Sequence, residues 1–130
     1  MLSFGKDKRL VSDKQFKAVL ARNLRVSNAL LTLYIAENDC GYPRLGISVG
    51  RTCGNAVVRN RWKRLLREAF RQNQNKIPAG FDYLLMISPR TRLLSKTEAG
   101  VKQPTFEQVK ASFLALVKEA VNKIIGQNLN

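Results

Sequence analysis

The sequence predicts a single-domain α+β fold with elements in the order α-β-β-β-α-β-α. Two patterns predict it. Apolar residues return every three or four positions in some segments, which is typical of helices, and alternate with polar or small residues in others, which is typical of strands. The length of 130 residues suits one core, and no internal repeat divides it. We therefore assign residues 1–130 to one domain.

The first half of the chain contains one predicted helix and most of the strands. Ser12-Asp13-Lys14-Gln15 has the pattern of a capping box and opens a short helix that continues to about Arg22. The sequence then alternates from Leu24 to Glu37, and the order given above requires a separate short strand from Leu24 to Ser27. Arg44 to Gly50 alternates again and predicts the next strand.

The second half contains the two remaining helices and the last strand. A helix is predicted over residues 54–71, and Phe81 to Ser88 alternates as a strand. We expect a mobile surface loop at about 89–104, because this stretch has little periodicity. Thr105-Phe106-Glu107-Gln108 is a second capping box that opens the last helix, which Gly126 is expected to end.

The charge of the chain points to an anionic partner. Lys and Arg number 23 against 9 Asp and Glu, a formal charge of +14, which opposes compaction unless a polyanion neutralises it. The candidates are nucleic acid, an anionic membrane and an acidic protein. A membrane is the weakest, because no apolar run approaches the ~20 residues that span a bilayer. The start of the chain, MLSFGKDKRLV, lacks the apolar stretch of a signal peptide, so we expect a cytoplasmic protein.

The residue types that usually carry catalysis or hold metals are scarce. The chain has no histidine, and Cys40 and Cys53 are too far apart for a CxxC pair. We expect two free thiols that act as small packing residues, because a structural disulfide is uncommon in a reducing compartment. The few carboxylates are scattered and suggest no metal-binding pair. We therefore predict no catalytic residue and no metal site on this chain.

The helix over 54–71 has two different faces, and Asn55 is its predicted N-cap. The only i,i+4 pair of opposite charge is Arg64 and Glu68, whereas pairs such as Lys63 and Arg67 repel by roughly a few tenths of a kcal/mol. That cost, and the planar fork of Arg, favour a nucleic acid as the partner. At about 100° per residue, the apolar stripe consists of Val58, Trp62, Leu65, Leu66, Ala69 and Phe70, and the cations lie opposite or on its flanks.

The second face of the sheet favours RNA over DNA. Tyr34 and Thr32 are expected to face away from the core, with Gly46 and Ser48 beside them on the neighbouring strand. An aromatic ring beside small residues leaves room for a base to stack, which is worth ~1–3 kcal/mol. Phe16 would form the other wall of this cleft, or would instead pack with Tyr34 in a second small core. No helix-turn-helix, zinc-finger or basic-zipper spacing is visible, so DNA is not expected as a partner.

The stretch RLGISVGRTCGNAVVRNRWKRLLREAFR resembles the signature of the bacterial ribonuclease P protein subunit. Its centre is Arg59-Asn60-Arg61, preceded by Gly54-Asn55-Ala56-Val57 and followed by Lys63-Arg64 and Arg67-Glu68-Ala69. The similarity covers nearly the whole chain. The triplet by itself would be a weak signal, whereas the ordered set is specific.

The resemblance implies where RNA would bind. It implies a small α/β sandwich with about four strands in a mixed sheet. It also implies a left-handed crossover of the arginine-rich helix between parallel strands, although twisted strands ordinarily favour the right-handed connection. The helix would meet the catalytic RNA of ribonuclease P, and a cleft would hold the 5′ leader of precursor tRNA. The loop from Pro89 onward matches a metal-associated region in some members. The matched RNA-binding residues are Arg51, Arg59, Asn60, Arg61, Lys63, Arg64 and Arg67, and the matched cleft residues are Phe16, Tyr34 and Ser48.

Two positions depart from the family pattern. Arg51-Thr52 stands where the family often has a lysine pair, which removes one phosphate contact, and Leu20 stands where an aromatic residue is often found. The implied function is that of a subunit of an endoribonuclease, which assists removal of the leader to give the mature tRNA 5′ end. Hydrolysis would take place on the RNA with bound Mg²⁺, and the chain alone would bind no cofactor. A ribosomal or other structural RNA-binding protein shares the charge and fold class and remains the alternative.

Overall fold

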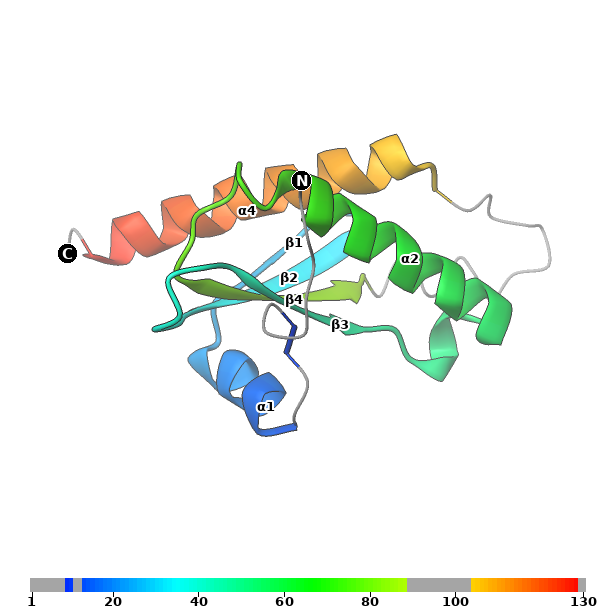
Figure 1. Ribbon diagram of the computed structural model, residues 1–130, viewed down its shortest axis with the longest axis horizontal. Coiled ribbons are helices and arrows are strands. Elements are labelled where there is room, and N and C mark those ends of the chain that lie inside the picture. Colours follow the sequence, from blue (N-terminus) through cyan, green and yellow to red (C-terminus); the bar gives the residue numbers. More distant parts are fainter. Residues whose placement is uncertain (1–8, 11–12, 89–103, 129–130) are drawn as a thin grey trace.

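The structure is a computed structural model that describes residues 9–10, 13–88 and 104–128. The predicted loop at 89–104 therefore lies outside the described residues except for its last position. The predicted order of elements is confirmed, and the short strand β1 is separate from β2 (Figure 1). The elements are α1 (Asp13–Arg22), β1 (Arg25–Ser27), β2 (Leu31–Glu37), β3 (Arg44–Ser48), the 3-10 helix η2 (Arg51–Cys53), α2 (Ala56–Asn73), β4 (Phe81–Ile87) and α4 (Phe106–Asn128).

The four strands form one mixed sheet in the order β1-β2-β4-β3. β1 with β2 and β2 with β4 are antiparallel, whereas β3 with β4 is parallel. The expectation that β2 and β3 are neighbours is wrong, because β4 lies between them. The physical reason is burial: Tyr83, Leu84 and Leu85 of β4 are all 0% exposed, and only a central strand covered on both faces can bury consecutive residues in this way.

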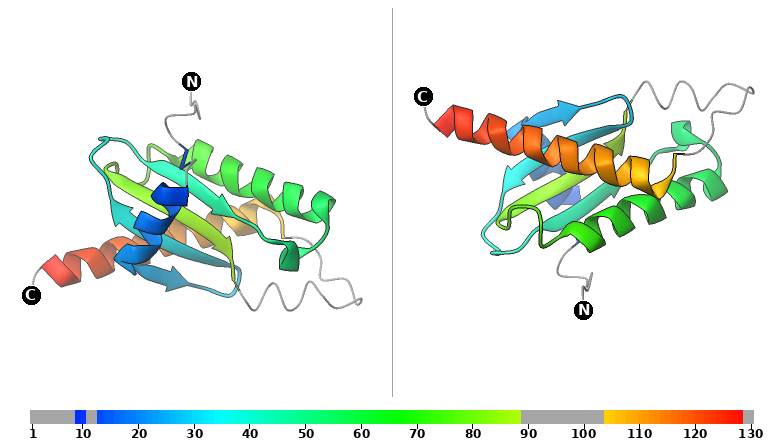
Figure 2. Two further views of the ribbon diagram at one scale, coloured as in Figure 1. Left: turned by 90° about the horizontal axis from the view of Figure 1, so that it is seen from below. Right: turned by 90° about the horizontal axis from the view of Figure 1, so that it is seen from above.

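The sheet has helices on both faces. α1 crosses one face, and α2 and α4 cover the other, as the two views of Figure 2 show. α2 joins the adjacent parallel strands β3 and β4, and the connection crosses over in the left-handed sense (Figure 1). This geometry carries the arginine-rich helix away from β3 and back to the start of β4 on the α4 side of the sheet.

The main core fills the layer between the sheet and the helices α2 and α4. Phe70, Tyr83 and Phe113, one from each of three elements, form a triangle with ring centroids 6.4 Å apart in each pair. Burying each such side chain stabilises the fold by about 1.5–3 kcal/mol. A second, smaller core lies under α1 and consists of Leu10, Val19, Ala36 and Leu84 with Phe16 and Tyr34 packed against it.

The ends of α4 confirm one sequence signal and overturn another. The capping box is formed, because Thr105 Oγ1 accepts from Gln108 N at 3.2 Å while Thr105 N donates to Gln108 Oε1 at 2.9 Å. The predicted stop at Gly126 is wrong, since the helix continues to Asn128. A glycine that ends a helix usually has a positive φ. Gly126 does not, whereas Gly41, Gly54 and Gly80 do.

Candidate nucleic-acid interface

α2 separates a buried apolar face from a basic one. Asn55 fixes its beginning, because the side-chain oxygen of this residue accepts a hydrogen bond from Val58 N at 3.0 Å. Trp62 and Leu66 are 2% and 0% exposed in the main core, as the predicted stripe requires. The other side of the helix carries the predicted RNA-binding residues, of which Arg59 and Lys63 are half-buried and Asn60, Arg61, Arg64 and Arg67 are exposed.

Glu68, the one acidic residue within α2, binds two side chains in the last turns of the helix. Its carboxylate accepts hydrogen bonds from Arg71 Nε at 3.1 Å and from Gln72 Nε2 at 2.8 Å. These hydrogen bonds lower the pKa of Glu68 to about 2, and the one from Arg71 makes the larger contribution. Glu68 forms no ion pair with Arg64, its i,i+4 neighbour, because both carboxylate oxygens accept hydrogen bonds from Arg71 instead.

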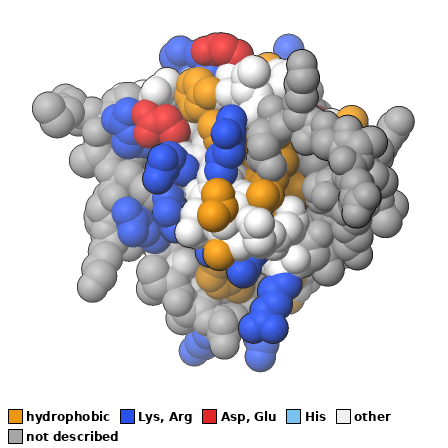
Figure 3. Space-filling model, turned by 90° about the vertical axis from the view of Figure 1, so that its right-hand side faces the viewer, with side chains coloured by type: hydrophobic (Ala, Val, Ile, Leu, Met, Phe, Trp, Pro, Cys, Tyr) orange, Lys and Arg blue, Asp and Glu red, His pale blue; other side chains and the backbone are white. Residues whose placement is uncertain are grey.

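The remaining cations of α2 have no acidic partner within the described part of the chain. The ion pairs found there are Arg22–Glu37, Arg44–Asp82 and Arg71–Glu68. Nε of Arg59 is buried and has no hydrogen-bond partner among the described residues, which is an unfavourable state for a polar atom. Figure 3 shows the end of the molecule at which η2 and the start of α2 lie: basic side chains are spread among hydrophobic ones, and the acidic ones drawn lie toward the upper edge.

A shallow hollow of about 510 Å³ lies on the exposed surface of α2. Val57, 77% exposed, contributes an apolar surface beside guanidinium groups. Such a surface can contact a base through its apolar part and a phosphate through its cations at the same time. The hollow is lined by Val57, Asn60, Arg61, Arg64 and Leu65.

A cavity of about 430 Å³ opens on the α1 side of the sheet, and we call it the sheet cavity. Most of its lining residues are direct cross-strand neighbours. Arg25 on β1 is paired with Tyr34 on β2. A second row crosses all four strands and consists of Ser27, Thr32, Met86 and Ser48. The structure thus brings the predicted cleft residues Tyr34 and Ser48 together. The sheet cavity is lined by Arg25, Ser27, Thr32, Tyr34, Ser48, Gly50, Cys53, Met86 and Ile87.

Phe16 lies on the same side of the sheet but does not line the sheet cavity. It packs in the second core with Tyr34, which is the alternative that the sequence left open. Gly46 makes this packing possible, since a Cβ at this position would lie 3.0 Å from Phe16 Cε1 and from Leu10 Cδ1. Arg51, in η2 next to the lining residue Gly50, is exposed.

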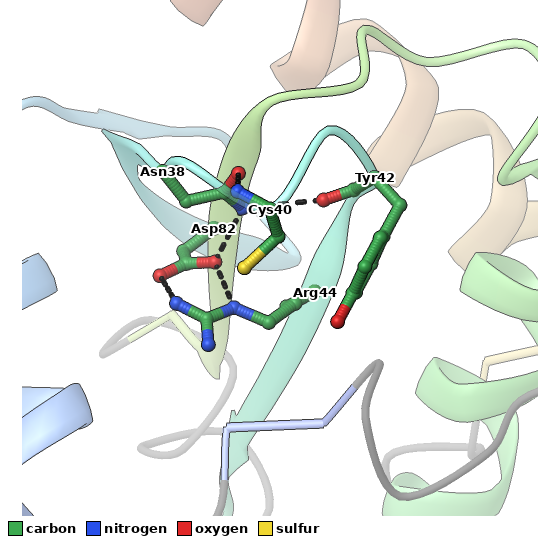
Figure 4. Close-up of polar contacts among 5 residues, drawn as sticks. All are labelled: Asn38, Cys40, Tyr42, Arg44 and Asp82. Atoms are coloured by element: carbon green, nitrogen blue, oxygen red, sulfur yellow. Dashed lines mark hydrogen bonds and ion pairs between the residues drawn. The ribbon is translucent and has the colours of Figure 1, made fainter.

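Sequence reasoning missed two features of this region. The first is Arg25. Alternating residues of a strand face opposite sides, so recognising that β1 and β2 form a hairpin would have put Arg25 on the same face as Tyr34. The second feature is a polar cluster at the start of β3 and β4, in which Asp82 accepts hydrogen bonds from Arg44 and from Asn38 Nδ2 (Figure 4). No local pattern announces this cluster, because its members are 38 and 44 residues apart.

The part of the chain that the structure describes contains neither a cluster of metal ligands nor a helix that could span a membrane. Within it, no group of three or more His, Cys, Asp or Glu side chains could hold a metal ion. Glu37, Glu68 and Asp82 are each paired with an arginine. The two cysteines are free, with Cys53 buried and Cys40 half-buried. None of the described helices combines the length and the apolar character that a membrane crossing requires.

The fold and the basic helix define a class: a small α+β protein with a left-handed β-α-β crossover whose surface suits an RNA partner. Residues 4–121 match the family model Ribonuclease P, and the chain belongs to this family. It is similar to the ribonuclease P protein component of Brevibacillus brevis, with 39% identity over 121 residues that make up 92% of this chain and 86% of the relative. The protein component of Clostridioides difficile is 33% identical over 90% of this chain and 95% of the relative.

Solved structures agree with this assignment. The ribonuclease P protein of Thermotoga maritima superposes with a TM-score of 0.73 at 32% identity, covering 85% of this chain and 96% of that one. The protein of Staphylococcus aureus gives a TM-score of 0.71 at 26% identity over 87% and 94% of the two chains. The chain is thus of the kind that forms the protein part of a ribonucleoprotein in tRNA processing, and its partner is an RNA.

Proposed function

We propose that this chain binds the catalytic RNA of ribonuclease P through α2 and the 5′ leader of precursor tRNA through the sheet cavity. In this role it assists the endonucleolytic removal of the leader in the cytoplasm. The observation that carries the proposal is the basic face of α2, whose cations other than Arg71 have no acidic partner among the described residues. A phosphate backbone would supply the missing negative charge.

The proposed RNA-binding residues on α2 are Arg59, Asn60, Arg61, Lys63, Arg64 and Arg67, with Arg51 on η2. An acceptor from the RNA would also satisfy the buried Nε of Arg59. On the sheet, Tyr34 would stack on a base of the leader, and Ser48 would offer a hydroxyl to it. Phe16 would support Tyr34 from the second core and contact the leader only at the margin of the cavity.

The chemistry is proposed to belong to the RNA. No group of the described acidic side chains could hold Mg²⁺, and we propose that the RNA holds the metal. Bound to the RNA, Mg²⁺ would activate the attacking water and stabilise the leaving oxygen. The protein would neutralise phosphates that crowd around this centre and hold the leader in place.

Cleavage of precursor tRNA at low Mg²⁺ tests the proposal. The catalytic RNA is assayed with and without the full chain over a series of Mg²⁺ concentrations. We expect the chain to lower the Mg²⁺ concentration needed for cleavage and to be inactive in the absence of the RNA. An unchanged Mg²⁺ requirement would contradict the proposal and favour a structural RNA-binding role.

A further inference from the structure

Arg25 occupies a distinctive position in the sheet cavity. It lies on β1, one of the two edge strands, and its direct cross-strand partner is Tyr34 on β2. Its neighbour Val26 is 4% exposed in the main core, so Arg25 and Ser27 face the opposite, cavity side of the sheet. The Ser27 hydroxyl confirms this orientation, because it lies 2.9 Å from Thr32 Oγ1 on the same side.

The guanidinium of Arg25 is available to a ligand. Arg25 is exposed, and the interaction found for it within the described residues involves its backbone, whose carbonyl accepts from Lys123 Nζ at 3.3 Å. By contrast, nearby Arg22 is held by Glu37 through Nε at 3.1 Å. A basic side chain without an acidic partner at the mouth of a cavity can accept a phosphate.

The neighbours of Arg25 suit a nucleotide. Directly opposite residues on antiparallel strands have Cβ atoms about 4.5–5.5 Å apart, so the ring of Tyr34 and the stem of Arg25 border the same space. The floor beyond them carries the hydroxyls of Thr32 and Ser48 and the thioether of Met86. An aromatic ring, hydroxyls and a forked cation together can hold a base, a ribose and a phosphate.

The position of Arg25 also defines a path. Arg51 lies beside Gly50 at the β3 end of the sheet cavity, and Arg25 lies at the β1 end. The outer strands β1 and β3 are three spacings of about 4.8 Å apart, which leaves room for more than one nucleotide between these ends. We propose that Arg25 binds a phosphate of the leader at the β1 edge, so that single-stranded RNA crosses the sheet from β3 to β1 over Tyr34. This inference rests on the proposed function.

The test compares binding of two precursor tRNAs, one with a leader of a single nucleotide and one with a leader long enough to cross the sheet. The full chain, assembled with the catalytic RNA, is used as wild type, Arg25→Ala, Arg25→Lys and Lys118→Ala. Lys118→Ala is the matched control, because it removes one exposed cation from α4 on the opposite side of the sheet. Thermal unfolding of each variant checks that the chain is folded.

We expect Arg25→Ala to weaken binding of the long-leader precursor roughly tenfold and to leave the short-leader precursor unchanged. The slope of log affinity against log salt should fall by about 0.7 for the long leader, the value for one phosphate on a single strand. Arg25→Lys should keep the slope and lose part of the affinity, because lysine keeps the charge without the planar fork. Lys118→Ala should behave as wild type with respect to leader length.

Two results would overturn the inference: Arg25→Ala binding both precursors as wild type does, or losing affinity for both equally. Either outcome can occur while the wild-type complex still prefers the long leader, in which case the proposed function stands and Arg25 is not part of it. If the wild-type complex itself does not distinguish the two leaders, leader binding by the sheet cavity fails, and the inference about Arg25 fails with it.

Discussion

Arg44 and Asp82 form a two-pronged ion pair across the parallel strands β3 and β4. Nε and Nη2 of Arg44 each donate to a different carboxylate oxygen of Asp82 at 2.7 Å. The two residues are direct partners in the strand register. Asn38 Nδ2 donates to the same carboxylate at 2.7 Å and to Tyr42 O at 3.2 Å, so the cluster also holds the turn between β2 and β3. It therefore fixes the strand from which α2 departs.

Replacing Arg44 by alanine should destabilise the fold. The side chains of Arg44 and Asp82 are 19% and 8% exposed, and removal of the cation leaves a largely buried carboxylate without its main partner. We expect a loss of about 3 kcal/mol in the free energy of unfolding, measured by urea titration. Arg22→Ala, which breaks an ion pair whose side chains are 45% and 50% exposed, should cost much less, because water screens this pair. Equal losses in the two variants would contradict the role given to Arg44.

The pKa of Glu68 should depend on Arg71. Because Glu68 has a pKa of about 2 in the folded chain, lower than its usual value of 4.5, its contribution to stability is complete above the usual value. That contribution should disappear as the pH falls through the folded pKa near 2. NMR titration of the Glu68 carboxyl measures this pKa directly. Arg71→Ala should raise it toward the usual value, whereas Arg64→Ala should leave it unchanged; a reversed result would show that Glu68 pairs with Arg64 instead.

The ring of Tyr34 should contribute to leader binding without changing the charge-driven part. Stacking of ~1–3 kcal/mol corresponds to roughly 5- to 150-fold weaker binding of a long-leader precursor to the Tyr34→Ala complex. The salt dependence should stay as in wild type, because no cation is removed. Tyr34→Phe is the control, since it keeps the ring and its packing in the second core. Unchanged affinity in a folded Tyr34→Ala variant would remove this residue from the proposed site.

Arg64 and Arg71 are a matched pair for testing the basic face of α2. Both lie on the same helix, but Arg71 is engaged by Glu68 and Arg64 has no ion pair within the described residues. Arg64→Ala should weaken binding of the catalytic RNA and lower the salt slope by about 0.7–0.9. Arg71→Ala should have a smaller effect, because the Arg71 guanidinium already donates to the Glu68 carboxylate and is less available to a phosphate. Binding isotherms at several salt concentrations measure both quantities. A larger loss with Arg71→Ala would show that the two ends of the basic face had been assigned the wrong way round.

The helices could be predicted to the extent that their signals are local. The burial of Trp62 and Leu66 and the exposure of Arg64 follow from helical spacing alone, since residues on one face recur at a fixed interval. The capping box at Thr105 was predicted correctly for the same reason. Gly126 was misjudged, because glycine ends a helix only when the chain turns there and takes a positive φ.

The candidate site could be predicted only in part. Tyr34 and Ser48 were placed on one face by alternation, and they do line one cavity. Phe16 could not be assigned between the cleft and the core, because that depends on how closely α1 approaches the sheet over Gly46. Arg25 was overlooked, because its importance comes from pairing with Tyr34 and not from its own neighbours in the sequence.

The sequence by itself determined the elements, the two-faced arginine-rich helix and the excess of positive charge. These are properties of spacing and composition, which act over a few residues or over the whole chain irrespective of its path. The tertiary structure alone decided that β4 lies between β2 and β3, that Arg44 meets Asp82, and that Arg25 shares a cavity with Tyr34 and Ser48. The position of β4 and the Arg44–Asp82 pair join segments far apart in the chain, and the central position of β4 follows from the need to cover its apolar residues on both faces. The shared cavity also depends on the strand order, because Met86 of β4 lies between Thr32 and Ser48.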